Sequence, residues 1–255
     1  MNDHASKWKG LAWIVAACIM AAAFALGLSP LAHAIPWSWE KKLGSALEQD
    51  VSQQECRSDL RAQALLQRLI DRIYPVQPGD SAFSIEVKVV KNPVVNAYAT
   101  FGGKIYVNSG LLKQAESPEE LAGVLAYEIG HLHNRHILQG NMARLFTSLG
   151  IAIVFGTSAA AANWTNYLMD MGFSRSQEAQ ADEDGLARLQ KAHVDNQGFR
   201  RFFERMAKSG SAPVFLSDHP SNQSRMEMVD RFVNQDVAPI MTRDDWKILK
   251  NYCSA

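Results

Sequence analysis

The sequence predicts a mostly helical α+β domain that carries a small sheet ahead of its central helix. Residues 83–91 alternate apolar and polar side chains, which is typical of a half-buried strand. Residues 94–112 have the composition of two strands joined by a tight turn at Gly102–Gly103. Helical periodicity dominates the remainder and is best marked over 118–136. The 255 residues fit a single domain spanning 35–255, preceded by a leader.

The leader is predicted over residues 1–34. Two lysines precede the apolar run Leu11–Leu28, Ser29-Pro30 interrupts it, and an A-x-A sequence ends at Ala34. This pattern indicates a signal peptide cleaved after Ala34. An uncleaved membrane anchor is an alternative, because the run is about as long as the shortest spanning helices. Lipidation at Cys18 is a third. All three alternatives export the rest of the chain to the cell envelope or periplasm.

Export bears on two cysteines, Cys56 and Cys253, which remain beyond the leader. Outside the cytosol they can form a disulfide, and the alternative is two free thiols. A bond between them would close a very long loop, worth roughly 4–5 kcal/mol in the chain-entropy model.

Amphipathic helices are predicted around the sheet. The first is expected over 44–73, where apolar residues recur at helical spacing, and the proline- and glycine-containing stretch 74–80 ends it. Residues 145–169 carry no charge and are strongly apolar. We expect a buried helix or lid hairpin there, with a second membrane segment as the alternative. Further helices are expected over 174–192, 196–210 and 242–252, and after the loop that begins at 217.

The central helix has a well-marked start. Ser117 is a candidate N-cap, Pro118 suits the first helical position, and Glu120 completes a capping box. Leucine, valine and isoleucine side chains between 121 and 132 form one apolar face. Positions 127, 128 and 131 lie on an adjoining stripe, because residues three and four apart are neighbours on a helix.

That stripe carries the sequence YEIGH, residues 127–131. Two histidines four apart on a helix can bind one Zn²⁺, and the Glu after the first of them acts as general base. Here Glu128 holds the base position and His131 the second-ligand position, whereas Tyr127 holds the first. Alone, the pattern is weak, because a Glu and a His three apart on a helix are common and a surface ion pair is their ordinary interpretation. His133 and His136 are expected on other faces, as solvated or helix-capping groups.

A second motif adds weight to the first. Glu178 and Asp182 lie one turn apart on the helix predicted over 174–192. Catalytic zinc held by two helix histidines often takes a Glu as its third protein ligand, and a nearby carboxylate often accepts the N–H of a ligating His. A solvated Glu–Asp pair is the ordinary alternative.

Four pieces in order resemble a known family. They are VNAYATFGGKIYVNSGLL at 95–112, SPEELAGVLAYEIGH at 117–131, FSRSQEAQAD at 173–182 and DHPSNQSR at 218–225. Together they resemble the gluzincin peptidases typified by the CAAX prenyl protease and HtpX, family forty-eight of the metallopeptidases. The likeness covers roughly residues 60–250.

The resemblance implies roles for individual residues. His131 and Glu178 would bind one zinc ion per chain, Glu128 would be the general base, and Asp182 would accept the N–H of a ligating histidine. His219 would reach the metal as a reversible plug, and Arg225 would steady the oxyanion. A loop turn and a surface charge are the ordinary alternatives for these last two. The segment with Asn96, Ala97, Tyr98 and Ala99 would pair with an extended peptide by strand addition.

Tyr127 departs from the family pattern, which has His at this position. A phenol reaches farther than an imidazole, and its ordinary pKa of about 10 means that ligation requires a phenolate. Three interpretations remain open. In the first, a metal ion is held by His131, Glu178 and either Tyr127 or His219, and some hydrolysis survives. In the second, metal binding is weak or absent and the chain is a pseudopeptidase. In the third, a natural His has been altered to Tyr in this sequence.

The resemblance also implies partners. Zinc-dependent endoproteolysis of unfolded or unassembled envelope proteins is the expected activity, and a chaperone-like peptide-binding module is the alternative. Membrane contact would run through the N-terminal segment if it is uncleaved. A nucleic-acid partner is not expected, because 26 basic and 26 acidic residues balance and no basic run stands out.

Overall fold

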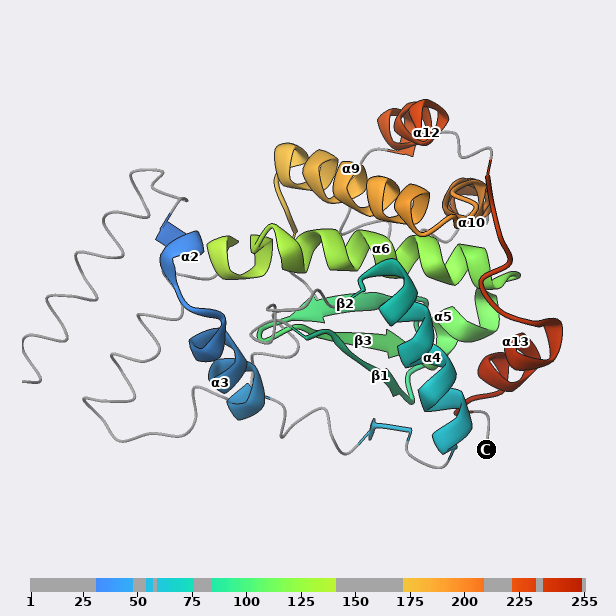
Figure 1. Cartoon of the computed structure of the whole chain (residues 1–255), viewed down its shortest axis with the longest axis horizontal. Helices are drawn as coiled ribbons and strands as arrows, with labels where there is room; N and C mark the ends of the chain where they lie inside the picture. The colour runs from blue at the N-terminus through green and yellow to red at the C-terminus, as the bar shows by residue number, and fades with distance from the viewer. Residues whose placement is uncertain are drawn as a thin grey trace, which may run out of the picture.

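The computed structural model shows the predicted α+β fold, in which one long helix separates a small sheet from a second layer of helices. The central helix α6 (Pro118–His133) runs across the molecule, with the sheet on one side and α9 (Arg175–Lys191) and α10 (Gln197–Lys208) on the other (Figure 1). The residues described by the structure are 31–47, 54–56, 59–75, 84–140, 172–208, 222–232 and 236–253.

The sheet has three strands, β1 (Glu86–Val90), β2 (Ala97–Thr100) and β3 (Lys104–Asn108), in the order β1-β3-β2. β3 pairs in parallel with β1 and antiparallel with β2. The predicted hairpin turn is confirmed, because Gly102 and Gly103 have φ angles of +78° and +80°, which glycine adopts without a steric penalty. Every residue of β2 and β3 is buried.

The expectation of one continuous helix over 44–73 was wrong. The structure has α3 (Trp37–Leu47) and α4 (Leu60–Ile73), and between them Glu55 forms a β-bridge with Val90. A new helix starts after Asp59, whose side chain accepts hydrogen bonds from the backbone N–H groups of residues 61 and 62. The apolar residues keep a helical spacing across this region of the sequence, but at Glu55 the backbone pairs with β1 instead of continuing a helix.

The predicted start of α6 is confirmed, although its capping box is only half formed. Ser117 Oγ accepts a hydrogen bond from the Glu120 backbone N–H at 3.3 Å. The Glu120 carboxylate instead accepts from the backbone N–H of Glu116, at 2.9 Å, and from Arg205. The helix ends at His133, three residues earlier than expected. Arg135 then adopts a φ of +56°, and residues 136–140 form a further short helix.

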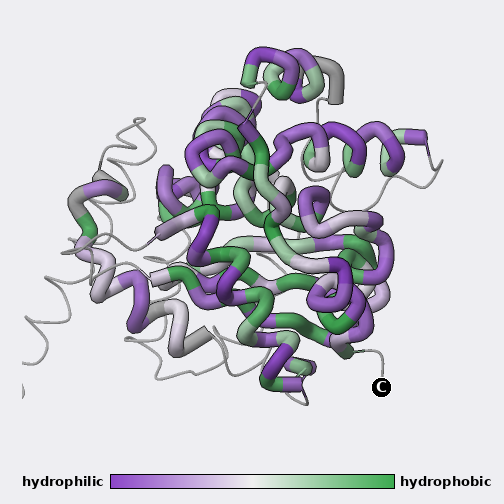
Figure 2. The backbone as a smooth tube through the Cα atoms, turned by 45° about the vertical axis from the view of Figure 1, so that its right-hand side comes forward, coloured by the Kyte–Doolittle hydropathy of each residue, from purple (hydrophilic) through white to green (hydrophobic). Residues whose placement is uncertain are grey.

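The helix α9 begins with a complete capping box between Ser174 and Gln177 and follows its predicted range closely. It packs tightly on α6, where a Cβ atom added at Gly185 would lie 2.9 Å from the backbone carbonyl of Ala126. The remaining helices are α5 (Ser109–Gln114), α12 (Asn222–Arg231) and α13 (Arg243–Lys250). Hydrophobic stretches lie mainly inside the molecule, and hydrophilic ones predominate on its outer helices (Figure 2).

The N-terminal part of the described chain is anchored to the domain. The short helix α2 (Leu31–Ala34) is the only part of the predicted leader that the structure describes. Arg135 donates hydrogen bonds to the carbonyls of Ala32 and Ile35, and its guanidinium lies 3.9 Å from the Trp37 ring centroid. The apolar segment 145–169 lies outside the described residues. Within the residues described, no helix is both long and apolar enough to cross a bilayer.

Of the two alternatives for Cys56 and Cys253, the structure has the disulfide, with 5.5 Å between the two Cα atoms. It joins the segment beside β1 to the turn after α13. Tyr252 reinforces the junction by donating a hydrogen bond from its hydroxyl to the Cys56 carbonyl.

Candidate functional site

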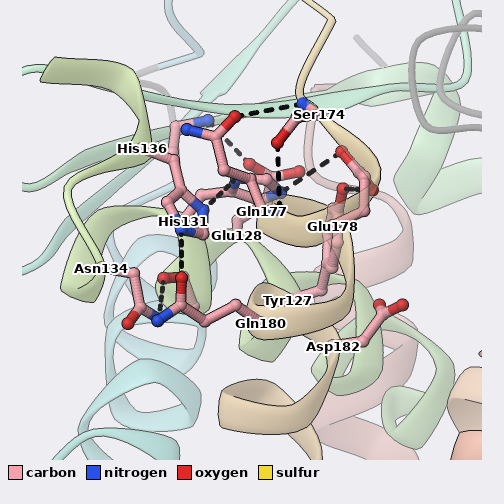
Figure 3. Close-up of polar contacts among 12 residues, drawn as sticks. Tyr127, Glu128, His131, Asn134, His136, Ser174, Gln177, Glu178, Gln180 and Asp182 are labelled. Atoms are coloured by element: carbon pink, nitrogen blue, oxygen red, sulfur yellow. Dashed lines mark hydrogen bonds and ion pairs between the residues drawn. The ribbon is translucent and has the colours of Figure 1, made fainter. Parts of the chain in front are cut away.

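The candidate site lies between α6 and α9. From α6 come Tyr127, Glu128 and His131, and from α9 come Glu178 and Asp182 (Figure 3). All five side chains are buried, although four of them carry ionisable acid or histidine groups. The structure therefore brings together the residues that the two sequence motifs singled out.

Tyr127 is bonded to the predicted third ligand. Its hydroxyl donates a hydrogen bond to Glu178 Oε2 at 2.5 Å. Burial raises the pKa of this phenol well above its ordinary value, with the nearby carboxylates adding to the shift and Arg225 opposing it. Tyr127 therefore remains a protonated donor.

Arg225, on α12, completes this cluster. Its Nη2 donates to the same Glu178 oxygen at 2.9 Å, and its Nε donates to Asp182 Oδ2 at 2.8 Å. The guanidinium carbon also lies 4.6 Å from the Tyr127 ring centroid and 4.5 Å from that of Phe203, within cation–π range. The side chain is only 2% exposed, which excludes the alternative of a surface charge.

Asp182 takes a different partner from the one expected. The resemblance implied that it accepts the N–H of a ligating histidine, but its hydrogen-bond partner is Arg225. Burial raises the pKa of Asp182 to about 6, despite the opposing effect of the guanidinium. With Tyr at position 127 there is no imidazole N–H at that position to donate, so the Arg225 contact is what holds the carboxylate.

Glu128 contacts the sheet. Its Oε2 accepts a hydrogen bond from the Ala99 backbone N–H at 2.9 Å. Burial raises the pKa of Glu128 well above its ordinary value, and the Ala99 contact opposes the shift. Within the predicted substrate edge, the backbone hydrogen-bonding groups of Asn96 and Tyr98 point toward β3. Those of Ala97 and Ala99 lie at the alternate positions and point away from β3, toward the free edge of the described sheet.

His131 is fully buried among aromatic rings. The Phe173 ring centroid lies 3.9 Å away, and the Tyr127 ring approaches edge-on at 4.6 Å. The His131 Nε2 atom lies 3.8 Å from Glu178 Oε1. Its other ring nitrogen, Nδ1, lies 3.1 Å from Nδ1 of His136.

The expectation that His136 is solvated was wrong, and sequence reasoning missed this residue. The side chain is fully buried, and its Nε2 lies 3.0 Å from Gln180 Oε1. A continuous helix would place position 136 away from the 127–131 stripe. The left-handed turn at Arg135 redirects the chain and returns His136 to the site. The expectation for His133 is confirmed, since it is about half exposed and pairs with Asp184. His219 lies outside the described residues.

The comparisons with known proteins identify the family of this chain. The family model described as peptidase family M48 matches residues 59–233, more than half of the chain. The chain belongs to peptidase family M48.

Curated relatives include metalloendopeptidases from several kingdoms. Mitochondrial metalloendopeptidase OMA1 of Schizosaccharomyces pombe is 30% identical over 200 residues, which covers 72% of this chain and 58% of the relative. The Arabidopsis thaliana protein of the same name is 34% identical over 150 residues, covering 57% and 31%. Beta-barrel assembly-enhancing protease of Yersinia pestis is 28% identical over 170 residues, covering 58% and 34%. This chain therefore spans between about one third and three fifths of these relatives.

M48 peptidases depend on zinc, so the described residues can be tested against it. A catalytic zinc takes three protein ligands and keeps one open position. His131 and Glu178 are two side chains of the right kind, but Tyr127 uses its hydroxyl to donate to Glu178. Within the described ranges, no three His, Cys, Asp or Glu side chains form a group able to hold a metal ion. The described residues do not fit the catalytic zinc site of this family.

Proposed function

We propose that this chain is an M48 member that retains the peptidase fold, does not hydrolyse peptide bonds, and acts by binding polypeptides. The observation that carries the proposal is the bond from the Tyr127 hydroxyl to Glu178 Oε2, at the position where the family pattern has a ligating histidine. It supports the binding-module alternative over the peptidase expectation.

The surrounding contacts strengthen this interpretation. The Glu178 oxygen that accepts from Tyr127 also accepts from Arg225, so the candidate ligand already has two donors. The Arg225 guanidinium supplies a buried positive charge beside both Glu178 and Asp182. A second cation placed among these carboxylates would be repelled by this one, and it would have to displace the tyrosine hydrogen bond.

The partner class follows from the family. Endopeptidases act on polypeptide chains, and we propose unfolded or unassembled polypeptides of the cell envelope as the partners here. The edge strand β2 is the proposed contact, through the backbone groups of Ala97 and Ala99. Both residues are buried in this structure, so a peptide would have to displace what covers them. Because the Ala99 N–H is bonded to Glu128 in this structure, a peptide would have to compete with that carboxyl group for it. Export by the N-terminal segment, as a released or membrane-anchored form, belongs to the same proposal.

A second candidate function is zinc-dependent endoproteolysis. It is favoured by the retention of Glu128, His131 and Glu178 together, and by the buried Glu128 Oε1, which accepts no hydrogen bond in the described part of the chain. The third ligand would come from Tyr127 or from His219.

Zinc content separates the two candidates. We would measure zinc in the purified full chain, and chelator-sensitive cleavage of casein, beside the Tyr127→His variant and its matched control Tyr127→His with Glu128→Gln. The proposal expects neither zinc nor cleavage in the parent. It expects about one zinc per chain in both variants, and cleavage only where Glu128 is kept. Stoichiometric zinc in the parent, with cleavage that Glu128→Gln abolishes, would establish the second candidate instead.

Binding needs its own measurement. Fluorescently labelled casein should bind the parent chain, and the affinity should not change on addition of a chelator. The peptide-binding proposal fails if casein does not bind, or if binding follows the zinc content of the preparation.

A further inference from the structure

We infer that His136 and Gln180 are positioning residues that fix the tautomer of His131, keeping its hydrogen on Nδ1 and its lone pair on Nε2. The sequence motifs assign neither residue a role: His136 lies beyond the YEIGH stretch, and Gln180 lies within FSRSQEAQAD between Glu178 and Asp182. The three side chains form a linear series of contacts from α9, through the short helix after Arg135, to α6 (Figure 3).

The direction of the hydrogen bonds follows from Gln180. Its Oε1, an amide oxygen, lies 3.0 Å from His136 Nε2 and can only accept. His136 Nε2 therefore carries a hydrogen. A neutral imidazole has one N–H, so His136 Nδ1 is an acceptor.

The same reasoning extends to His131. Its Nδ1 lies 3.1 Å from His136 Nδ1, and two ring nitrogens at this distance require that one of them donates. Since His136 Nδ1 accepts, His131 Nδ1 donates. Its remaining nitrogen, Nε2, is left with a lone pair. The 3.8 Å separation between that nitrogen and Glu178 Oε1 is longer than a hydrogen bond and agrees with an Nε2 that has no hydrogen to donate.

The rings cannot easily rotate out of this arrangement. Phe173 lies against the face of the His131 ring, with centroids 3.9 Å apart, and Tyr127 meets it edge-on. His136 has no exposed surface, and the left-handed turn at Arg135 sets its direction. Both rings are fully buried, so the hydrogen bond between them, if lost, would not be replaced by one to bulk water, whereas Gln180 itself is exposed on α9.

The tautomer matters because the neutral imidazole nitrogen with the lone pair is the one that accepts hydrogen bonds or binds a cation. His136 and Gln180 therefore hold His131 in its ligating form even though Tyr127 occupies the neighbouring ligand position. The inference concerns the chain as it stands and does not depend on whether the chain hydrolyses peptides.

Nitrogen-15 NMR of the labelled full chain at pH 8 reads the tautomers directly. Long-range ring correlations should show His131 with a protonated Nδ1 and a bare Nε2, and His136 with the opposite pattern. Spectra of His131→Gln and His136→Gln assign the signals. A hydrogen on His131 Nε2, whether alone or together with one on Nδ1, overturns the inference.

Substitutions at Gln180 test the cause. Gln180→Glu keeps an oxygen acceptor and should preserve the His131 pattern, whereas Gln180→Leu removes the acceptor and should give a mixture of His131 tautomers. Glu183→Leu, at an exposed position on the same helix, is the matched control and should leave the spectrum unchanged. Thermal melts confirm that each variant is folded. A folded Gln180→Leu variant whose His131 signal is identical to that of the parent would show that Gln180 does not set the tautomer.

Discussion

Tyr127 shows how one side chain can preserve a buried polar site while changing its chemistry. Its ring contacts His131 and Arg225, and its hydroxyl satisfies Glu178. A smaller apolar residue at this position would leave the Glu178 carboxylate with fewer donors in a buried environment, which is costly. Tyrosine fills the volume and provides the donor at the same time.

Removing only the hydroxyl isolates this contribution. Tyr127→Phe should lower the free energy of unfolding by about 1.5–3 kcal/mol, the usual range for a hydrogen bond to a charged group. Urea denaturation measures it. The variant should acquire no zinc, unlike Tyr127→His. An unchanged unfolding midpoint would show that the bond to Glu178 does not stabilise the cluster.

The contact between α6 and α9 places both halves of the site. Gly185 allows the two helix backbones to approach closely beside Tyr127, because a Cβ atom there would lie 2.9 Å from the Ala126 carbonyl group. The spacing of the helices thus depends on a residue that itself has no side chain in the site.

Gly185→Ala tests that spacing. Alanine favours a helix over glycine by about 1 kcal/mol, but overpacking typically costs about 1–3 kcal/mol. We expect a net loss of stability, together with a shift in the NMR signals of Tyr127 and His131. Glu183→Ala, on the exposed face of α9, should change stability by less than about 0.5 kcal/mol. Stabilisation by Gly185→Ala would mean that the helices can separate at no cost.

The helix α3 carries a pH-sensitive contact with the sheet. Glu40 is buried and accepts a hydrogen bond from the Gly102 backbone N–H at 3.3 Å. Burial raises the pKa of Glu40 to about 7, although that bond and Arg135 oppose the shift. A folded-state pKa above the unfolded one means that folding favours the protonated form. Stability from this group is therefore greatest below about pH 4.5 and falls as the pH rises through 7.

Glu40→Gln should remove this dependence. At pH 8 the variant should be more stable than the parent, by at most about 3 kcal/mol, and at pH 4.5 the two should be nearly equal. Urea midpoints measured from pH 4.5 to 8 provide the comparison, with Glu183→Gln as an exposed control. Parallel pH profiles for parent and Glu40→Gln would rule out Glu40 as the source.

Features with local signals could be predicted from the sequence. Ser117 and Pro118 mark the start of α6, the Gly102–Gly103 pair marks the hairpin, and Ser174 lies directly before α9. Each depends on a few adjacent residues. Glu128, His131 and Glu178 lie on two such helices, and the structure brings them together as the two motifs and the family resemblance led us to expect.

Features that depend on distant contacts could not be predicted. The helix expected through residue 55 is broken because Glu55 pairs with Val90 on a separate strand. The location of His136 depends on the left-handed backbone conformation of Arg135. Arginine gives no sequence signal for that conformation, unlike glycine or asparagine. The partner of Asp182 is Arg225, which lies 43 residues away on a helix whose packing the sequence does not specify.

Across the whole molecule, stability should depend on the disulfide and not on metal. The bond between Cys56 and Cys253 spans a sequence separation of 197 residues, and closing a loop of this size is worth about 5 kcal/mol in the chain-entropy model. Changing both cysteines to serine should lower the melting temperature by on the order of 10 °C. A reducing agent should do the same to the parent, whereas a chelator should not. A melt that responds to the chelator and not to the reductant would contradict both expectations.

The same disulfide affects how cleavage of this chain by itself or by another protease is observed. One backbone cut anywhere between Cys56 and Cys253 leaves two fragments that remain covalently joined. Their combined mass exceeds that of the intact chain by only one water molecule, so a nonreducing gel would not separate nicked from intact protein. On such a gel, self-cleavage of the Tyr127→His variant between these two cysteines would become visible only after reduction. The loss of intensity of the intact band on reduction would then give the fraction of nicked molecules.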